Sequence, residues 1–154
     1  MKKMILGSAL SLSLVAGGAS AQTATGEVRF RYIVDDVPTT AAFYRDKLGF
    51  KLAAQAGTSF AALTKGGVVL FLSPTQGPGG ASQPMPDGRR PQPGGWTRIV
   101  IYVDDLPAEV ARLRGQGVRF RNEIVHGLGG DEILLEDPAG NPVELFQTAP
   151  AVKR

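Results

Sequence analysis

The chain carries one short pattern twice. Val34-Asp35-Asp36-Val37-Pro38 returns 69 residues later as Val103-Asp104-Asp105-Leu106-Pro107. A segment with strand-like alternation precedes each copy, over 28–33 and 97–102, and a helical segment follows each, over 39–48 and 108–116. Gly49 and Gly117 come directly after the helical segments, where glycine supplies the left-handed backbone that ends a helix. The pattern predicts two copies of one structural unit.

Three further strand-like segments follow each predicted helix. They cover 50–54, 59–64 and 68–73 in the first half, and 118–125, 132–136 and 142–147 in the second. Turn-forming residues separate them, at 65–67 and 137–141. Each half, 27–73 and 96–147, is therefore predicted to be a βαβββ module. A module this small cannot bury both faces of its sheet. We expect an α+β fold in which the modules pack into one curved, partly open mixed sheet with the helices outside.

The segment between the modules, 74–95, is rich in Gly, Pro and polar residues. Connections of this length are uncommon inside a compact domain and often have a function. Two interpretations are open. The segment is either a lid or binding loop, for which Met85, Arg89, Arg90 and Trp96 offer contact points, or a disordered spacer. Residues 22–26 and 148–154 are predicted to be tails.

The N-terminus has the three regions of a secretory signal peptide. Lys2 and Lys3 are basic, 4–16 is apolar, and Ala19-Ser20-Ala21 matches a cleavage site, which places the cut after Ala21. The alternative is an uncleaved helix that tethers the chain to a membrane. No cysteine follows the cut, so no lipid anchor is expected. We therefore expect a mature protein that is periplasmic or secreted and has no stable membrane anchor.

Composition excludes several kinds of site. With Cys 0 and His 1, the chain has no thiol nucleophile, no thiolate metal site and no site that needs two histidines from one chain. The formal charge of +3 includes Lys2 and Lys3 of the predicted signal peptide, so the mature chain is nearly balanced and nucleic acid is not an expected partner. His126 stands in a glycine-rich turn, where a surface role is expected.

Strand alternation sorts the side chains of each half into two faces. Phe30, Tyr32 and Val34 are placed toward the helix, as are the corresponding positions of the second half. Seven candidate ligand-binding residues fall on the opposite face: Arg29, Arg31, Trp96, Arg98, Tyr102, Glu144 and Phe146. If that face is flat it is an ordinary solvated surface. If the sheet curls into a trough, it is a pocket lining with fixed charges.

Three segments, 32–37, 43–50 and 134–147, resemble the vicinal oxygen chelate superfamily of glyoxalases, bleomycin-resistance proteins and dioxygenases. The last contains Asp137-Pro138-Ala139-Gly140-Asn141-Pro142-Val143-Glu144-Leu145. The resemblance covers about 27–147 and implies the paired βαβββ fold. It does not specify an activity, because members of this superfamily differ in their chemistry.

The resemblance also implies where metal-using relatives place their ligands. The first-strand positions hold Arg29 and Arg98 here, and the last-strand positions hold Val69 and Glu144. A single carboxylate cannot hold a catalytic divalent ion, and guanidinium groups have no lone pair to donate. We therefore expect a site without metal or other cofactor, with a divalent metal as the alternative.

Two functions remain open at this point. The first is a small-molecule binding protein, in which Arg29, Arg31 and Arg98 hold an anionic ligand; the arginines and Glu144 could instead form a structural salt bridge. The second is a lyase, isomerase or dioxygenase with Glu144 as general base. Relatives complete the trough within one chain or between two, so a homodimer is a further expectation. Asp35-Asp36 and Asp104-Asp105 are expected to be structural, because carboxylates suit helix N-termini.

Overall fold

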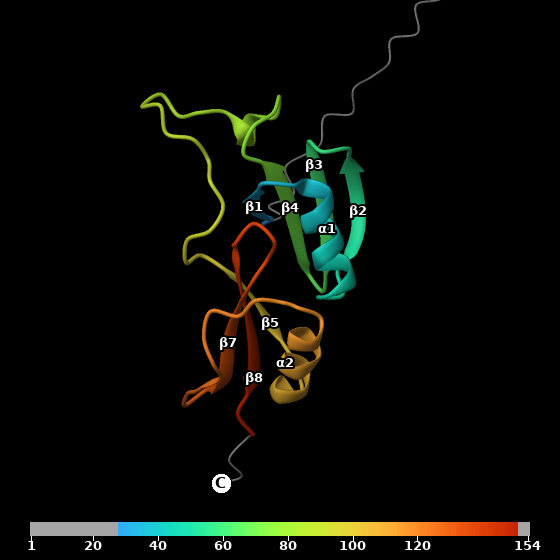
Figure 1. Cartoon of the computed structure of the whole chain (residues 1–154), viewed down its shortest axis with the longest axis vertical. Helices are drawn as coiled ribbons and strands as arrows, with labels where there is room; N and C mark the ends of the chain where they lie inside the picture. Colours follow the sequence, from blue (N-terminus) through green and yellow to red (C-terminus); the bar gives the residue numbers. More distant parts are fainter. Residues whose placement is uncertain (1–27, 151–154) are drawn as a thin grey trace, which may run out of the picture.

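The computed structural model describes residues 28–150, which form two βαβββ modules (Figure 1). The first contains β1 (Phe30–Val34), α1 (Val37–Asp46), β2 (Lys51–Ala56), β3 (Phe60–Lys65) and β4 (Val68–Pro74). The second contains β5 (Ile99–Tyr102), α2 (Leu106–Gly115), β6 (Val125–His126), β7 (Gly130–Glu136) and β8 (Pro142–Thr148). The predicted α+β class and the repeated module are confirmed. The proposed signal peptide 1–21 and its cleavage site lie outside the described residues, as do 22–26 and 151–154.

Each module forms its own four-stranded sheet, with strand orders β1-β4-β3-β2 and β5-β8-β7-β6. The first strand pairs in parallel with the last, and the other neighbours are antiparallel. The modules thus form two mixed sheets, where we expected them to pack into one curved sheet. β1 and β5 are edge strands that do not pair with each other. The Asn141 side chain bonds to the carbonyl of Ile33 at the outer edge of β1.

The predicted strand 118–125 is also corrected. Only its last residue belongs to β6, and Phe120 makes a single bridge to Leu135. The reason is local. The side-chain Oδ1 of Asn122 accepts the N–H of Leu134 at 2.9 Å, where a continuing strand would offer a main-chain carbonyl. The ladder therefore stops at this asparagine.

Both helices begin with a capping aspartate. Asp36 accepts the N–H of Thr39 at 2.7 Å, and Asp105 accepts the N–H of Ala108 at 2.9 Å. The bond from Thr39 holds the pKa of Asp36 below its ordinary value. The helices begin at Val37 and Leu106, two residues before the predicted starts, because each proline fits the first turn of its helix. The structural role expected for these acids is confirmed.

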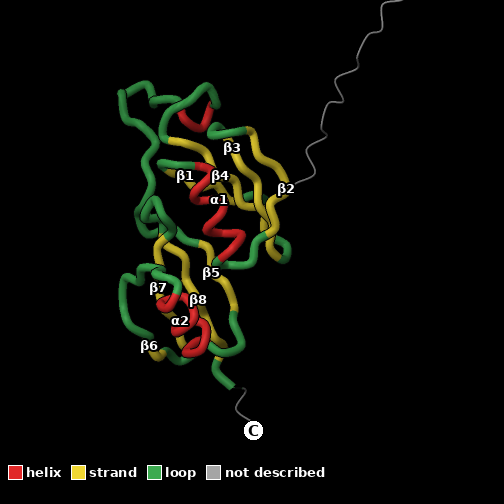
Figure 2. Tube along the Cα trace, turned by 45° about the vertical axis from the view of Figure 1, so that its right-hand side comes forward, coloured by secondary structure: helices red, strands yellow, loops and turns green. Residues whose placement is uncertain are grey.

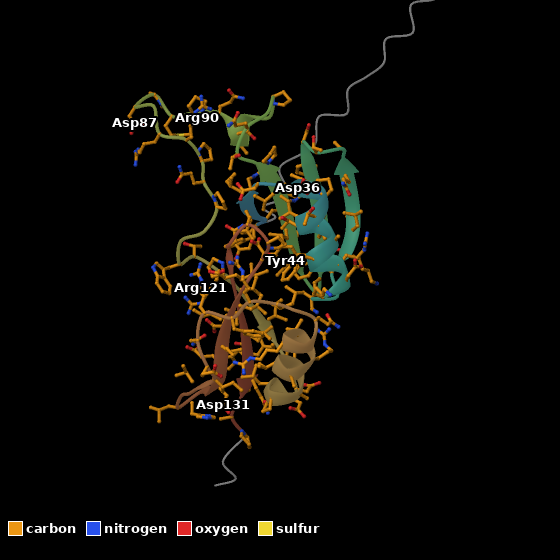
Figure 3. All side chains as sticks on the ribbon, in the orientation of Figure 1. Asp36, Tyr44, Asp87, Arg90, Arg121 and Asp131 are labelled. Atoms are coloured by element: carbon orange, nitrogen blue, oxygen red, sulfur yellow. The ribbon has the colours of Figure 1, made fainter. Side chains whose placement is uncertain are left out.

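One apolar core joins the modules on the helix side of both sheets. Its members from the first module include Tyr32, Val34, Tyr44, Leu63, Leu70 and Leu72, and those from the second include Leu106, Leu113, Ile133, Leu135, Val143 and Leu145. Tyr44 lies where the two modules meet (Figure 3), and its buried hydroxyl donates to Asp137 at 3.2 Å. The faces turned away from the helices remain outside this core.

The segment 74–95 runs as a loop beside the first module before it reaches β5 (Figure 2). It contains one short 3-10 helix, Gly80–Ser82. The buried Ser82 hydroxyl donates to the carbonyl of Pro74 at 2.7 Å, and the N–H of Gly94 donates to Asn141 Oδ1 at 2.7 Å. The first bond ties the short helix back to the last residue of β4, and the second attaches the end of the segment to the β7–β8 turn. No helix within residues 28–150 combines the length and the hydropathy that a membrane crossing requires.

Candidate functional site

The sheet faces turned away from the helices carry the candidate residues, as strand alternation predicts. On the second module, Val100 is 46% exposed and Tyr102 is 69% exposed, whereas Ile99 on the helix side is 8% exposed. On the first module, Arg31 is exposed and Tyr32 beside it is buried. Large apolar and charged side chains therefore share an accessible face on each sheet.

Arg98 and Glu144 form an ion pair on the open face of the second module. The Nε of Arg98 donates to Glu144 Oε2 at 2.6 Å, and the Glu144 side chain is 8% exposed. The second module thus brings together two of the predicted site residues. The pair balances its own charge, so Arg98 does not supply the unpaired positive charge that the sequence suggested.

The strand register corrects one equivalence between the modules. Phe30 is paired with Leu70 in β4, and Ile99, its repeat partner, is paired with Val143 in β8. The residue of the first module that corresponds to Glu144 is therefore Phe71, and not Val69. The sequence could not distinguish them, because both lie on the same face of β4 and only the register selects one.

Phe71 is the centre of a second group, on the open face of the first module. The guanidinium carbon of Arg29 lies 5.2 Å from the centroid of its ring, and that of Arg31 lies 5.1 Å from it. Both distances fit a cation–π contact. Arg31 also donates to the hydroxyl of Ser73, which is 3% exposed. Sequence reasoning did not find Phe71 or Ser73, because neither belongs to a recognisable motif.

Aromatic side chains form two separate groups on the second module. The rings of Tyr102 and Phe146 meet edge to face with centroids 5.3 Å apart. Trp96 is 72% exposed and lies instead under Arg121, whose guanidinium carbon is 5.3 Å from the indole centroid. Arg121 also pairs with Glu136 at 3.0 Å. Tyr102 and Phe146 therefore belong together as predicted, but Trp96 packs with a residue that the sequence did not single out.

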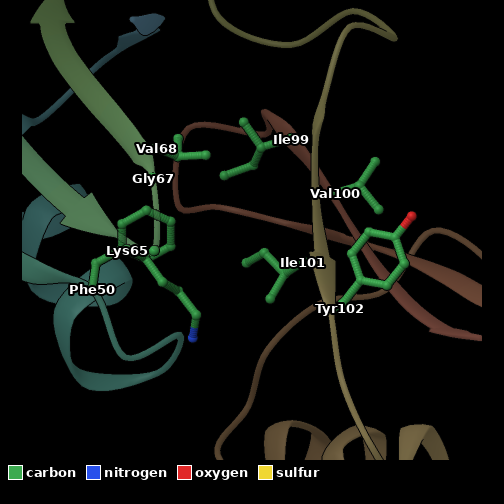
Figure 4. Close-up of a pocket in the computed structure, with 9 residues that line it drawn as sticks. Phe50, Lys65, Gly67, Val68, Ile99, Val100, Ile101 and Tyr102 are labelled. Atoms are coloured by element: carbon green, nitrogen blue, oxygen red, sulfur yellow. The ribbon is translucent and has the colours of Figure 1, made fainter.

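A hollow of about 310 Å³ lies between the modules at the outer edge of β5 (Figure 4). Its lining is mostly apolar and includes Phe50, Val68, Ile101 and Tyr102. Among the described residues that line it, Lys65 alone is charged, and its Nζ donates to the carbonyl of Leu48 at 2.6 Å. The hollow reaches the exposed Tyr102 and is continuous with the open face of the second sheet.

The residues present do not fit a catalytic divalent ion. Residues 28–150 contain no group of three or more His, Cys, Asp or Glu side chains that could hold one. At the ligand positions that the resemblance implies, Arg29, Arg98 and Phe71 offer no lone pair suited to a metal. The remaining position, Glu144, already accepts a hydrogen bond from Arg98. The side chains at these four positions therefore do not support metal-dependent chemistry.

A comparison with protein-family models decides the family. The model described as Glyoxalase/Bleomycin resistance protein/Dioxygenase superfamily matches residues 27–145. The chain belongs to this superfamily. A comparison with curated proteins finds no match.

Solved structures share the superfamily fold with this chain. Lactoylglutathione lyase from Agrobacterium tumefaciens has a TM-score of 0.62 at 22% identity, over 78% of this chain and 91% of that one. A glyoxalase/bleomycin resistance protein/dioxygenase from Nocardioides has a TM-score of 0.62 at 21% identity, over 82% and 85%. TnmS3, an antibiotic binding protein from Streptomyces sp. CB03234, has a TM-score of 0.56 at 22% identity, over 79% and 96%. At these identities the likeness establishes the fold alone.

His126 lies away from the groups described above. It stands in β6, its side chain is 78% exposed, and its Nδ1 lies 2.8 Å from Asp131 Oδ1. Asp131 is its partner residue in the β6–β7 hairpin, at the end of the second module that lies away from the first module (Figure 3). The surface position predicted for the single histidine of this superfamily member is confirmed.

Proposed function

We propose that this superfamily member is a metal-independent protein that binds a small, anionic organic molecule on the open faces of its sheets. The observation that carries the proposal is the Arg98–Glu144 ion pair at 2.6 Å. Glu144 stands at the position where metal-using relatives are expected to have a metal ligand, and here its carboxylate is paired with Arg98 instead. An antibiotic binding protein and a lyase share the fold, and the residues here favour binding over catalysis.

The apolar part of the ligand would contact Tyr102 and Phe146. Their edge-to-face pair leaves Tyr102 69% exposed, and the hollow beside β5 adds Val68 and Ile101. Exposed aromatic groups beside a hollow are typical of sites that bind small organic molecules. The anionic part would contact an arginine of the open faces, since guanidinium groups bind carboxylates and phosphates through two parallel hydrogen bonds.

The enzyme alternative gives Glu144 the role of general base. A base must offer a free carboxylate oxygen near the proton that it removes. Glu144 is buried and its Oε2 already accepts from Arg98, so this role has less support than binding.

We further propose that two copies of the chain complete the site. The shared core joins the modules on the helix side. The candidate residues of the open faces are divided between the two sheets, with Arg29 and Arg31 on the first and Arg98 and Glu144 on the second. β1 and β5 are both edge strands with no strand on their outer side, and edge strands favour association. In a homodimer the first module of one copy would face the second module of its partner. Sedimentation of the mature protein tests this, and a monomer at high concentration would contradict it.

We also propose that the protein is exported from the cytoplasm. The support is the sequence pattern of 1–21 alone. Expression of the full chain in bacteria, followed by cell fractionation and N-terminal sequencing, should give a periplasmic protein that begins at Gln22. A full-length chain in the cytoplasm would contradict export.

Metal content is the first experiment for the binding function. The purified mature protein should contain no stoichiometric metal, before or after soaking with Zn²⁺, Ni²⁺, Mn²⁺, Fe²⁺ and Mg²⁺. Stoichiometric tight binding would overturn the metal-independent function and favour the enzyme. If no metal binds, a thermal-shift screen of small organic anions should identify ligands, and Tyr102→Ala should weaken those that contain an apolar group.

A further inference from the structure

A second hollow, of about 340 Å³, lies along the outer edge of β1 and separates it from the end of the segment 74–95. It is distinct from the hollow beside β5, with which it shares no lining residue. Its polar lining residues come from β1 and the residue before it, from the stretch that leads into β5 and from the β7–β8 turn: Arg29, Arg31, Gln92, Thr97 and Asn141. Three separate parts of the chain therefore form its wall.

Asn141 holds these walls in place. The residue is 2% exposed, its Nδ2 donates to the carbonyl of Ile33 in β1 at 2.9 Å, and its Oδ1 accepts the N–H of Gly94 at 2.7 Å. Asp137 accepts the other Nδ2 hydrogen at 2.9 Å. A buried amide thus joins β1 to the opposite wall, and the hollow is a built part of the fold.

Arg31 is one of the residues that line this hollow. Ser73 and the ring of Phe71 position its guanidinium, which carries five N–H donors. Its main-chain N–H, unlike the guanidinium held over β4, points to the outer edge of β1 for a geometric reason. In a parallel pair, alternate residues direct both main-chain groups to the same side, and the carbonyl of Ile33 points outward to Asn141. The N–H of Arg31, two residues earlier, therefore also points away from β4.

The charge of Arg31 is not balanced by the groups that hold it. Its contacts are a hydroxyl and an aromatic ring, both neutral. Arg98 and Arg112, in contrast, each donate to a carboxylate. No aspartate or glutamate is among the described residues that line the hollow, and the Arg29 guanidinium lies over the same Phe71 ring.

We propose that Arg31 binds the oxyanion group, a carboxylate or a phosphate, of a small molecule that enters the hollow beside β1. The oxyanion would accept from the Arg31 guanidinium where the hollow meets the open face and from the Arg31 main-chain N–H at the edge of β1, and Thr97 lines the same space. This inference rests on the proposed binding function for its biological meaning. It assigns the anionic contact to Arg31 and excludes Arg98, whose charge Glu144 already balances.

The test uses inorganic phosphate and acetate as probes and the mature chain as the protein. Each probe is titrated at low ionic strength while the amide signals of Arg31 and Thr97 are followed by NMR. We expect saturable shifts, at least tenfold weaker binding in Arg31→Gln, and unchanged binding in the control variant Arg112→Gln, whose ion pair with Glu109 lies on α2. A preference for phosphate or acetate would distinguish the two oxyanion classes. Thermal unfolding of each variant shows that it is folded.

Three results would overturn the inference. They are the absence of saturable binding, equal binding by Arg31→Gln and the unchanged chain, and an equal loss in Arg112→Gln. Arg31→Lys keeps the charge without the planar fork, so it should bind more weakly than the unchanged chain and more tightly than Arg31→Gln. Failure here is distinguishable from failure of the proposed function. If a ligand from the thermal-shift screen binds Arg31→Gln and the unchanged chain equally, the binding function stands while the anion site does not.

Discussion

The hydroxyl of Tyr32 is inserted into the start of the β5–β8 ladder. It accepts the N–H of Ile99 at 3.0 Å and donates to the carbonyl of Pro142 at 2.7 Å. The N–H of Val103 donates directly to Phe146 at 2.9 Å, so the same register would bring the N–H of Ile99 to the carbonyl of Pro142. A side chain of the first module thus replaces one main-chain bond of the second.

Tyr32→Phe removes this bridge and leaves the ring in place. Each lost hydrogen bond costs about 1 kcal/mol, and each buried main-chain group left without a partner costs about 1–3 kcal/mol. Two bonds and two such groups are involved, and closure of the strands would re-pair part of them. We expect a loss of roughly 2–4 kcal/mol in the free energy of unfolding. At about 4 °C per kcal/mol this lowers the Tm by roughly 8–16 °C.

The matched control is Tyr44→Phe, which removes a hydroxyl from the same core. That hydroxyl makes a single bond, to Asp137 at 3.2 Å, and Asp137 keeps its bonds from Ala139 and Asn141. We expect a smaller loss, about 1 kcal/mol. Urea unfolding followed by circular dichroism measures both variants. If Tyr32→Phe costs no more than Tyr44→Phe, the bridge does not hold the modules together.

Three further predictions concern the second module. Gly130→Ala should cost at least about 2 kcal/mol, because its φ is +149° and a Cβ would lie 2.1 Å from a main-chain oxygen. Gly129→Ala, with its nearest contact at 3.9 Å, should be nearly neutral in the same unfolding assay. A double-mutant cycle of Arg98→Met and Glu144→Leu should give about 1–3 kcal/mol of coupling, and none would contradict the ion pair. Burial raises the pKa of Asp137, so the folded chain binds this proton more tightly than the unfolded chain. The destabilisation from ionised Asp137 is complete above the raised pKa and decreases as the pH falls through it. Unfolding at several pH values should show this trend, and Asp137→Asn should lack it.

The repeat and the turn residues were sufficient to predict the modules. Helix caps, glycine stops and strand alternation depend on residues close in sequence, and Asp36 and Asp105 cap their helices as expected. Alternation also placed Arg98 and Glu144 on one face, where they form an ion pair. The predicted strand 118–125 failed because one asparagine side chain competes for a main-chain N–H, which composition alone does not reveal.

The sequence by itself determined the two-module fold and the chemistry available on the open faces, because short-range preferences repeat with the pattern. Only the tertiary structure decided which charges are balanced. Glu144 pairs with Arg98, while Arg31 is held by Phe71 and Ser73. The sequence could not predict these partners, because parallel strands can be paired in several registers that place the same residues on the same face. Register is set by long-range packing, in which the Tyr32 hydroxyl and the Asn141 amide join segments that are distant in sequence.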